Sequence, residues 1–169
     1  MNLSGISYES FADGEGVRVS VFVSGCHRHC PGCFNPEAQN FDFGECLTGG
    51  IRSGISKHLA KPYISGLTML GGEPMDEENV AGTLQIVRLA KALGKTVWIY
   101  SGYTFEELIS RCDSQTQDVL RETDVLVDGP FIEALRDATL AFRGSSNQRI
   151  IDVQESLRIG KAVLYKDGL

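Results

Sequence analysis

The sequence predicts an α/β domain with a mainly parallel sheet of about six strands. Short apolar runs with the period of strands alternate along the chain with longer runs that have helical spacing. Glycine follows several of these runs, at points where the chain must turn. The chain has 169 residues, 42% of them hydrophobic, which is enough to bury a core of its own. Alternating strands and helices typically build a parallel sheet covered by helices.

Six segments have the composition of strands. The first alternates valine with other residues from Val17 to Val23 and ends at Ser24-Gly25. A later run is short and wholly apolar, and it stops at Gly71-Gly72. In order along the chain, the predicted strands are 17–23, 67–70, 96–100, 125–127, 149–153 and 162–165.

Helices are predicted between these strands. A loop runs from Cys26 to about residue 50, and a helical stretch follows at 51–59. The next helix is expected to start near Asp76 and to end at Gly94, because apolar residues recur every three or four positions between them. Thr104, followed three residues later by Glu107, has the pattern of a capping box that opens another helix.

The polar and glycine-bearing segments follow the predicted strands. In parallel α/β folds, functional sites collect at the carboxyl ends of the strands. The segments in question are 26–33, 71–74, 101–102 and 128–129. We therefore expect them to meet at one edge of the sheet.

Composition excludes several classes of function. The net charge of −6 argues against a generally basic surface for nucleic acid or anionic lipid. No apolar run approaches the length of a membrane span. Residues 1–16 carry Asp13 and Glu15 and lack an apolar region, so they do not resemble a signal peptide. We therefore expect a soluble protein of the cytoplasm that binds neither nucleic acid nor membrane.

Five cysteines are present, and three of them, Cys26, Cys30 and Cys33, fall within eight residues. In a reducing compartment such a cluster indicates a metal or redox site rather than a disulfide. The C-x3-C-x2-C spacing favours an iron–sulfur cluster, on which three thiolates leave one iron open for catalysis. A structural zinc site with His27 or His29 as fourth ligand, or simple buried thiols, remain alternatives. Cys46 and Cys112 are isolated, and we expect them not to be ligands.

The cysteine spacing resembles the signature of radical S-adenosylmethionine (SAM) enzymes. Flanking blocks resemble more narrowly the activating proteins of anaerobic (class III) ribonucleoside-triphosphate reductases, and together they cover most of the chain. These blocks are 13–26, 33–35, 71–74, 98–103, 125–129 and 142–148. There are two departures: Glu15 stands where relatives often carry proline, and Gly32 stands where many other radical enzymes carry an aromatic residue. Neither affects a predicted ligand.

The resemblance implies a single radical SAM domain over residues 1–169. A complete βα barrel typically needs about 250 residues, so the resemblance and the length together predict an incomplete, open radical-SAM barrel. Cys26, Cys30 and Cys33 would hold a [4Fe-4S] cluster whose open iron binds the amino and carboxylate groups of SAM. Reductive cleavage of SAM would then give methionine and a 5′-deoxyadenosyl radical. The implied protein substrate is an anaerobic ribonucleoside-triphosphate reductase, on which a glycyl radical forms, and the implied electron donor is a protein such as flavodoxin.

The resemblance also implies the cofactor-binding residues. The turn Gly71-Gly72-Glu73-Pro74 would receive the methionine amino group, with Glu73 facing the ammonium, although a plain strand-to-helix turn would have a similar sequence. Gly32 and Phe34 flank the ligand Cys33 and would touch the adenine end, although Phe34 would also suit a core. Ser101 and Asp128 would contact the ribose or methionine part, or would instead cap local loops. No catalytic residue beyond these ligands is predicted.

Two other functions remain open from the sequence. One is an activase of another glycyl-radical enzyme, of the formate-lyase type, although those chains are usually longer. The other is a non-catalytic zinc or iron–sulfur binding module. Metal analysis and colour would distinguish the last, because zinc proteins are colourless and four-iron proteins are brown.

Overall fold

The sheet has seven strands, and its centre is parallel. The computed structural model describes residues 1–168. The strand order is β3-β1-β2-β4-β5-β6-β7, where β2, β4, β5 and β6 run parallel and the remaining pairs are antiparallel. The strands are β1 (Asn2–Ser10), β2 (Val17–Val23), β3 (Glu45–Cys46), β4 (Ile64–Gly71), β5 (Thr96–Tyr100), β6 (Val125–Asp128) and β7 (Arg149–Asp152). The mainly parallel sheet is therefore confirmed only for its four central strands.

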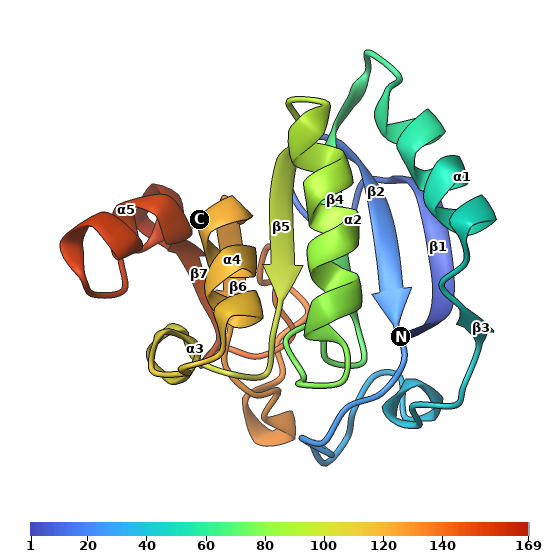
Figure 1. The fold of residues 1–169 in the computed structure, drawn as a ribbon. Coiled ribbons are helices and arrows are strands. Elements are labelled where there is room, and N and C mark those ends of the chain that lie inside the picture. The colour runs from blue at the N-terminus through green and yellow to red at the C-terminus, as the bar shows by residue number, and fades with distance from the viewer. Residues whose placement is uncertain (169) are drawn as a thin grey trace.

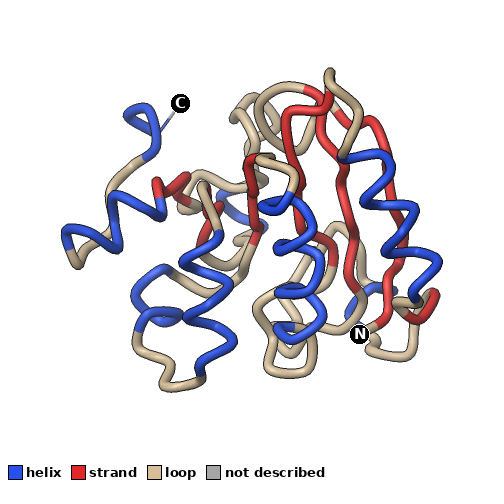
Figure 2. The backbone as a smooth tube through the Cα atoms, turned by 45° about the horizontal axis from the view of Figure 1, so that its top comes forward, coloured by secondary structure: helices blue, strands red, loops and turns tan. Residues whose placement is uncertain are grey.

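The helices lie mostly on one face of this sheet, and Figures 1 and 2 show α1, α2 and α4 in front of the strands. The helices are α1 (Gly49–Leu59), α2 (Val80–Ala92), α3 (Phe105–Ile109), α4 (Ser114–Glu122) and α5 (Val153–Ile159). The main core fills the space between these helices and the sheet, and it includes Val19, Val21, Val97 and Ile99. The sheet and its helices thus form two layers.

The alternation of side chains sends the neighbouring residues to the other face of the sheet. A smaller apolar cluster there contains Trp98, Val125, Val127 and Ile150. Phe22 and Tyr100 also lie on this face, between strand neighbours that point into the main core. This second face, rather than the helix-covered one, carries the candidate site.

Several predicted boundaries change. The N-terminal strand β1 was not predicted, and Ala162–Tyr165 is not a strand, since only Leu164 forms an isolated bridge to Ile151. The predicted strand 149–153 ends at Asp152, because the Asp152 side chain accepts a hydrogen bond from the Glu155 N–H and so caps α5. The helix expected near Asp76 begins at Val80, after a turn.

Other local predictions are confirmed. Thr104 and Glu107 form a capping box, in which the Thr104 hydroxyl accepts the Glu107 N–H and the Glu107 carboxylate accepts the Thr104 N–H. Gly94 follows α2 with a φ of +66°, which suits glycine at a helix end. The sheet has two edge strands, β3 and β7, and the incomplete barrel stays a prediction.

Candidate functional site

A cavity of about 520 Å³ lies where the central parallel strands end. The loops after β2, β4, β5 and β6 line it, together with residues just before β7. In Figure 1 the loop after β2 and the orange segment after β6 both lie at the bottom, below the tips of the strand arrows. The predicted site residues that line the cavity are Cys26, Cys30, Cys33, Phe34, Gly71, Gly72, Glu73 and Ser101. The expectation that these segments meet at one edge of the sheet is confirmed.

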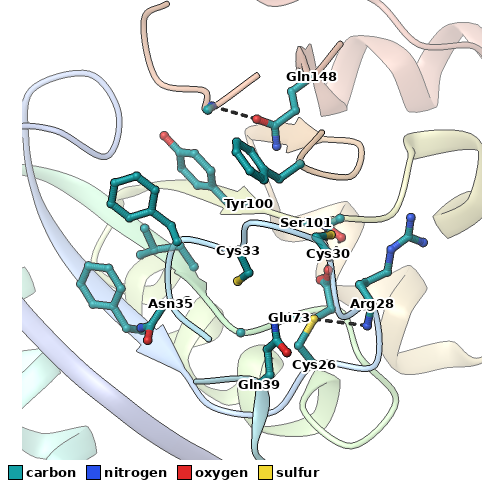
Figure 3. Close-up of a pocket in the computed structure, with 18 of the residues that line it drawn as sticks. Cys26, Arg28, Cys30, Cys33, Asn35, Gln39, Glu73, Tyr100, Ser101 and Gln148 are labelled. Atoms are coloured by element: carbon teal, nitrogen blue, oxygen red, sulfur yellow. Dashed lines mark hydrogen bonds between the residues drawn. The ribbon is translucent and has the colours of Figure 1, made fainter. Parts of the chain in front are cut away.

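Three cysteines, which we call the cavity cysteines (Cys26, Cys30 and Cys33), share the wall of this cavity (Figure 3). All three are free thiols and only partly exposed, whereas Cys46 and Cys112 are exposed and do not line the cavity. Positive φ angles at Gly25, His29 and Gly32 turn the loop back on itself between β2 and the third thiol. Burial raises the pKa of the Cys26 thiol to about 11, so ionising it in this position requires a compensating positive charge.

The cavity cysteines are not arranged around one metal ion. Within residues 1–168 no three histidine, cysteine or acidic side chains converge closely enough to hold a single ion. Tetrahedral zinc with bonds of about 2.3 Å would bring its sulfur ligands to about 3.8 Å from one another. A four-iron cluster binds each thiolate to a different iron, so its ligands stand farther apart. Three free thiols on the wall of one cavity are ligands of the kind that such a cluster takes.

The glycine pair Gly71-Gly72 is required by close packing of two chain segments. A Cβ atom on Gly72 would lie 2.5 Å from the carbonyl oxygen of Gly25, and Gly71 has a φ of +106°. The Gly72 N–H donates to Val23 O (2.8 Å) and the Glu73 N–H donates to Gly25 O (2.9 Å). The turn after β4 therefore lies directly against the base of the cysteine loop. Pro74 is buried outside the cavity lining.

Glu73 is a buried carboxylate at the cavity wall, with only 1% of its surface exposed. Its Oε1 accepts hydrogen bonds from the Met75 N–H and the Ser101 hydroxyl, both at 2.9 Å. Its Oε2 accepts the Gly102 N–H at 2.7 Å. Burial nevertheless raises the pKa of Glu73 to about 7, because the desolvation of the charge outweighs these three hydrogen bonds. A cation in the cavity would favour the ionised form.

Ser101 and Asp128 have different surroundings. Ser101 lines the cavity, donates to Glu73 and accepts the Tyr103 N–H, so it both reaches the site and caps a turn. Asp128 is fully buried outside the cavity lining. Its carboxylate pairs with Arg149 and accepts the Phe105 N–H at the start of α3 (2.7 Å). The loop-capping role considered for Asp128 is the one that its contacts support.

Gly32 and Phe34 lie on either side of Cys33, and of these two only Phe34 lines the cavity. Gly32 has a φ of +69°, a conformation that favours glycine, and a Cβ atom there would lie 2.6 Å from the carboxyl carbon of Glu133, whose side chain would have to move. The Phe34 ring lines the cavity and is 85% exposed, so it does not belong to the core. The Arg136 guanidinium lies 5.5 Å from the centre of this ring. The loop after β6 therefore touches the cysteine loop at two points.

Comparison with known proteins shows the family of this chain. A family model described as a 4Fe-4S single cluster domain matches residues 12–151. The anaerobic ribonucleoside-triphosphate reductase-activating protein of Escherichia coli K12 is 36% identical over 140 residues, 80% of this chain and 88% of that protein. The chain belongs to this family of activating proteins. The protein of that name from phage T4 is 35% identical over 152 residues, 89% of this chain and 93% of its own length. The Vibrio cholerae protein is 38% identical over 142 residues, 82% of this chain and 89% of its own.

Family membership favours the iron–sulfur interpretation of the cysteine loop over the structural zinc site.

Among residues 1–168, none of the helices is long and apolar enough to cross a membrane.

Residues without an individual predicted role also line the cavity, and one of them, Gln148, lies in residues 143–148, which the resemblance placed on the active-site face. Tyr100 and Gln148 lie at the same end of it (Figure 3), and both lie in sequence blocks that resemble the family. The Gln148 side chain accepts the Gly144 N–H and donates to Gly129 O, so it ties together the two ends of the loop after β6. Phe22 and Arg28 line the cavity as well, as do Asp13, Asn35, Gln39, Leu70 and Phe131. The alternation of β2 and β5 was the signal for Phe22 and Tyr100, since it sends both to the face opposite the main core.

Proposed function

We propose that this chain is an oxidoreductase that activates an anaerobic ribonucleoside-triphosphate reductase by generating a glycyl radical on it, through reductive cleavage of SAM at a [4Fe-4S] cluster. The observation that supports this most is the joint position of three free thiols and a buried carboxylate on one cavity. The names of the relatives supply the partner, a reductase that works without oxygen. They favour this partner over a formate-lyase type of enzyme.

In this proposal, the cavity cysteines are the three protein ligands of the cluster. Thiolates are the ligands that iron–sulfur clusters take, and the three come from one loop whose turns bring them to one wall. When bound, the cluster supplies the electron for cleavage of a C–S bond of SAM, and hence a radical able to take hydrogen from glycine. The positive charge of iron supplies the compensation that the buried Cys26 thiolate needs.

The chain's own residues would bind and orient SAM. The Glu73 carboxylate would face the methionine ammonium, because a buried carboxylate with a raised pKa gains from a neighbouring cation. Ser101 and Gly102 would hold that carboxylate in place through their hydrogen bonds. The backbone at Gly71 and Gly72 would lie along the cofactor, and Phe34 would cover its adenine end. Asp128 would act from a distance, by fixing the start of α3.

The reductase would dock at the mouth of the cavity. Phe34 (85% exposed) lines the cavity, and Ile132 (40%) and Leu135 (42%) are exposed on the loop after β6; we call these three apolar side chains the apolar rim. They come from the cysteine loop and from the loop after β6, which contact each other. Exposed apolar side chains gathered at one place are typical of protein interaction sites. An incomplete barrel would leave this side open, so that a backbone glycine of the reductase could enter. The reaction would take place in the cytoplasm, and a protein such as flavodoxin would donate the electron.

The test is an anaerobic activation assay. The chain is reconstituted with iron and sulfide, reduced, and mixed with SAM and the anaerobic reductase of the same organism. Electron paramagnetic resonance (EPR) should then show a glycyl radical on the reductase, and methionine and deoxyadenosine should appear together. Release of deoxyadenosine without any radical on the reductase would contradict the proposed partner. A formate-lyase type of enzyme that gains the radical in its place would establish the second candidate.

A further inference from the structure

The turn between Glu73 and α2 contains two polar side chains that are almost completely buried. Asp76 and Asn79 are each 1% exposed, although carboxylate and amide side chains in turns usually face water. Glu77 and Glu78, which lie between them, are exposed. Buried polar groups require hydrogen-bond partners, and for both residues these partners include groups in the cysteine loop or at its base.

Asn79 joins two separate loops through one nitrogen atom. Its Nδ2 donates to the carbonyl oxygens of Ser24 (3.0 Å), Gly25 (3.1 Å) and Glu73 (3.0 Å). The first two carbonyls belong to the base of the cysteine loop, and the third belongs to the turn that bears the Glu73 carboxylate. The Asn79 Oδ1 atom is buried without a hydrogen-bond partner among residues 1–168, so the nitrogen is the end of the amide that the surroundings bind.

Asp76 binds the cysteine loop on the other side of Cys26. Its Oδ2 accepts from the ring Nδ1 of His27 at 2.8 Å and from the His27 backbone N–H at 3.3 Å. The same residue is anchored to the start of α2, because its backbone oxygen accepts the N–H groups of Asn79 and Val80. Gly25 and His27, the two residues that flank Cys26, are thus both bound by the segment before α2.

We infer that Asp76 and Asn79 are positioning residues, which hold the cysteine loop and the glycine turn as one rigid unit. They thereby set the place of the cluster ligands relative to Glu73. This inference rests on the proposed function, in which the cluster and Glu73 bind two parts of the same cofactor. A displacement of about 1 Å between groups that act on one bound molecule can reduce a rate about a hundredfold, so such a link has a large effect.

The experiment uses two variants and a matched control for each. Asn79→Asp removes the donor and places a carboxylate against three carbonyl oxygens. Its control is Gln117→Glu, because the Gln117 Nε2 also donates to three carbonyls, those of Leu108, Ile109 and Arg111, away from the cavity.

Asp76→Ala removes the acceptor of the two His27 hydrogen bonds. Its control is Asp113→Ala, which removes the carboxylate that accepts the Thr116 N–H at the start of α4. Each control makes the same chemical change at a side chain whose hydrogen bonds reach neither the cysteine loop nor the glycine turn.

Two measurements are made on every chain. In the iron-free protein, hydrogen exchange of the backbone amides of residues 24–33 should be about tenfold faster in Asn79→Asp and Asp76→Ala, because a lost link lets the loop open. Both controls should leave the exchange of these amides unchanged. In the reconstituted protein, the variants should keep about four irons per chain but bind SAM about tenfold more weakly, whereas the controls should bind within about twofold of the unchanged chain. If Asp76 and Asn79 only stabilised the fold, the variants and the controls would both lose stability. The variants would then not differ from the controls in the exchange of residues 24–33 or in SAM affinity.

If Asn79→Asp does not fold, Asp76→Ala alone tests whether these residues position the cysteine loop. The His27 side chain is 58% exposed, so water can replace its lost partner. Unchanged exchange and unchanged SAM affinity in Asp76→Ala would overturn the inference. If the chain without substitutions holds a reduced cluster but does not bind SAM, the proposed function is refuted. The hydrogen exchange of residues 24–33 in the iron-free protein would then test by itself whether Asp76 and Asn79 hold the cysteine loop.

Discussion

Replacing Glu73 with glutamine changes how the stability of the iron-free protein depends on pH. The carboxylate of Glu73 is 1% exposed and has a pKa of about 7 in the folded chain, against an ordinary value of 4.5. Below pH 4.5 the group is neutral in both the folded and the unfolded chain. Between pH 4.5 and 7 the unfolded chain releases the proton while the folded chain keeps it. Stability that Glu73 contributes at low pH is therefore lost as the pH rises through 7.

The size of this loss follows from the two pKa values. Each unit of difference corresponds to about 1.4 kcal/mol, so the free energy of unfolding should lose about 3 kcal/mol from this group between pH 4.5 and pH 7.5. Glu73→Gln removes the titrating group but keeps nearly the same shape. The amide nitrogen would face a hydrogen-bond donor in either orientation, since both carboxylate oxygens accept, so the variant is also less stable at every pH. The pH dependence, rather than the absolute stability, is the quantity to compare.

The assay is urea denaturation of both iron-free chains under reducing conditions, at several pH values from 4.5 to 8. The difference between the free energies of unfolding of the unchanged chain and of Glu73→Gln should fall by about 3 kcal/mol across this range and then level off. If the free energies of unfolding of the two chains change with pH in parallel, the raised pKa of Glu73 is refuted. The argument that a cofactor ammonium stabilises the Glu73 carboxylate would then be refuted as well.

Two further predictions concern the cluster and the partner. Replacing any one of the cavity cysteines with alanine should abolish the iron and sulfide content and the activation of the reductase. Alanine at Cys46 or Cys112 should leave both unchanged. Loss of the cluster in the Cys46 or Cys112 variant would show that the proposed ligand set is wrong. The double variant Ile132→Asp with Leu135→Asp should reduce radical formation on the reductase about tenfold or more, because charge on the apolar rim opposes burial against a partner. The same variant should still release deoxyadenosine from SAM in the absence of the reductase, and Ile159→Asp, an exposed apolar residue on α5, is its control.

The sequence predicted the elements whose pattern is local. The central strands β2, β4, β5 and β6 have clear apolar runs, and the capping box at Thr104 depends on residues three positions apart. Strand β1 was missed because only Leu3 among its residues is fully buried, so it has little apolar alternation. The strand predicted at 162–165 fails because strand pairing is a tertiary property: Leu164 is 50% exposed and reaches Ile151 by a single bridge.

The same division holds for the candidate site. Cysteine spacing placed three thiols in one loop, and the positions of strand ends brought Glu73 and Ser101 beside them. The surroundings of Asp128 were not predictable, because its partner Arg149 lies 21 residues away on an antiparallel strand. Gln148 reaches the cavity through a long loop that returns to the sheet just before β7, a position that the family resemblance indicated but the local sequence pattern did not. Contacts between distant segments were the part that the sequence pattern did not contain.

The central claim is that the cluster held by the cavity cysteines has an iron open to SAM. The most direct measurement is the EPR spectrum of the reduced, reconstituted protein under anaerobic conditions, before and after SAM is added. The account predicts that SAM changes the signal of the reduced cluster, because the amino and carboxylate groups of the cofactor become ligands of that iron. An unchanged signal, in protein shown to contain a reduced four-iron cluster, would contradict it.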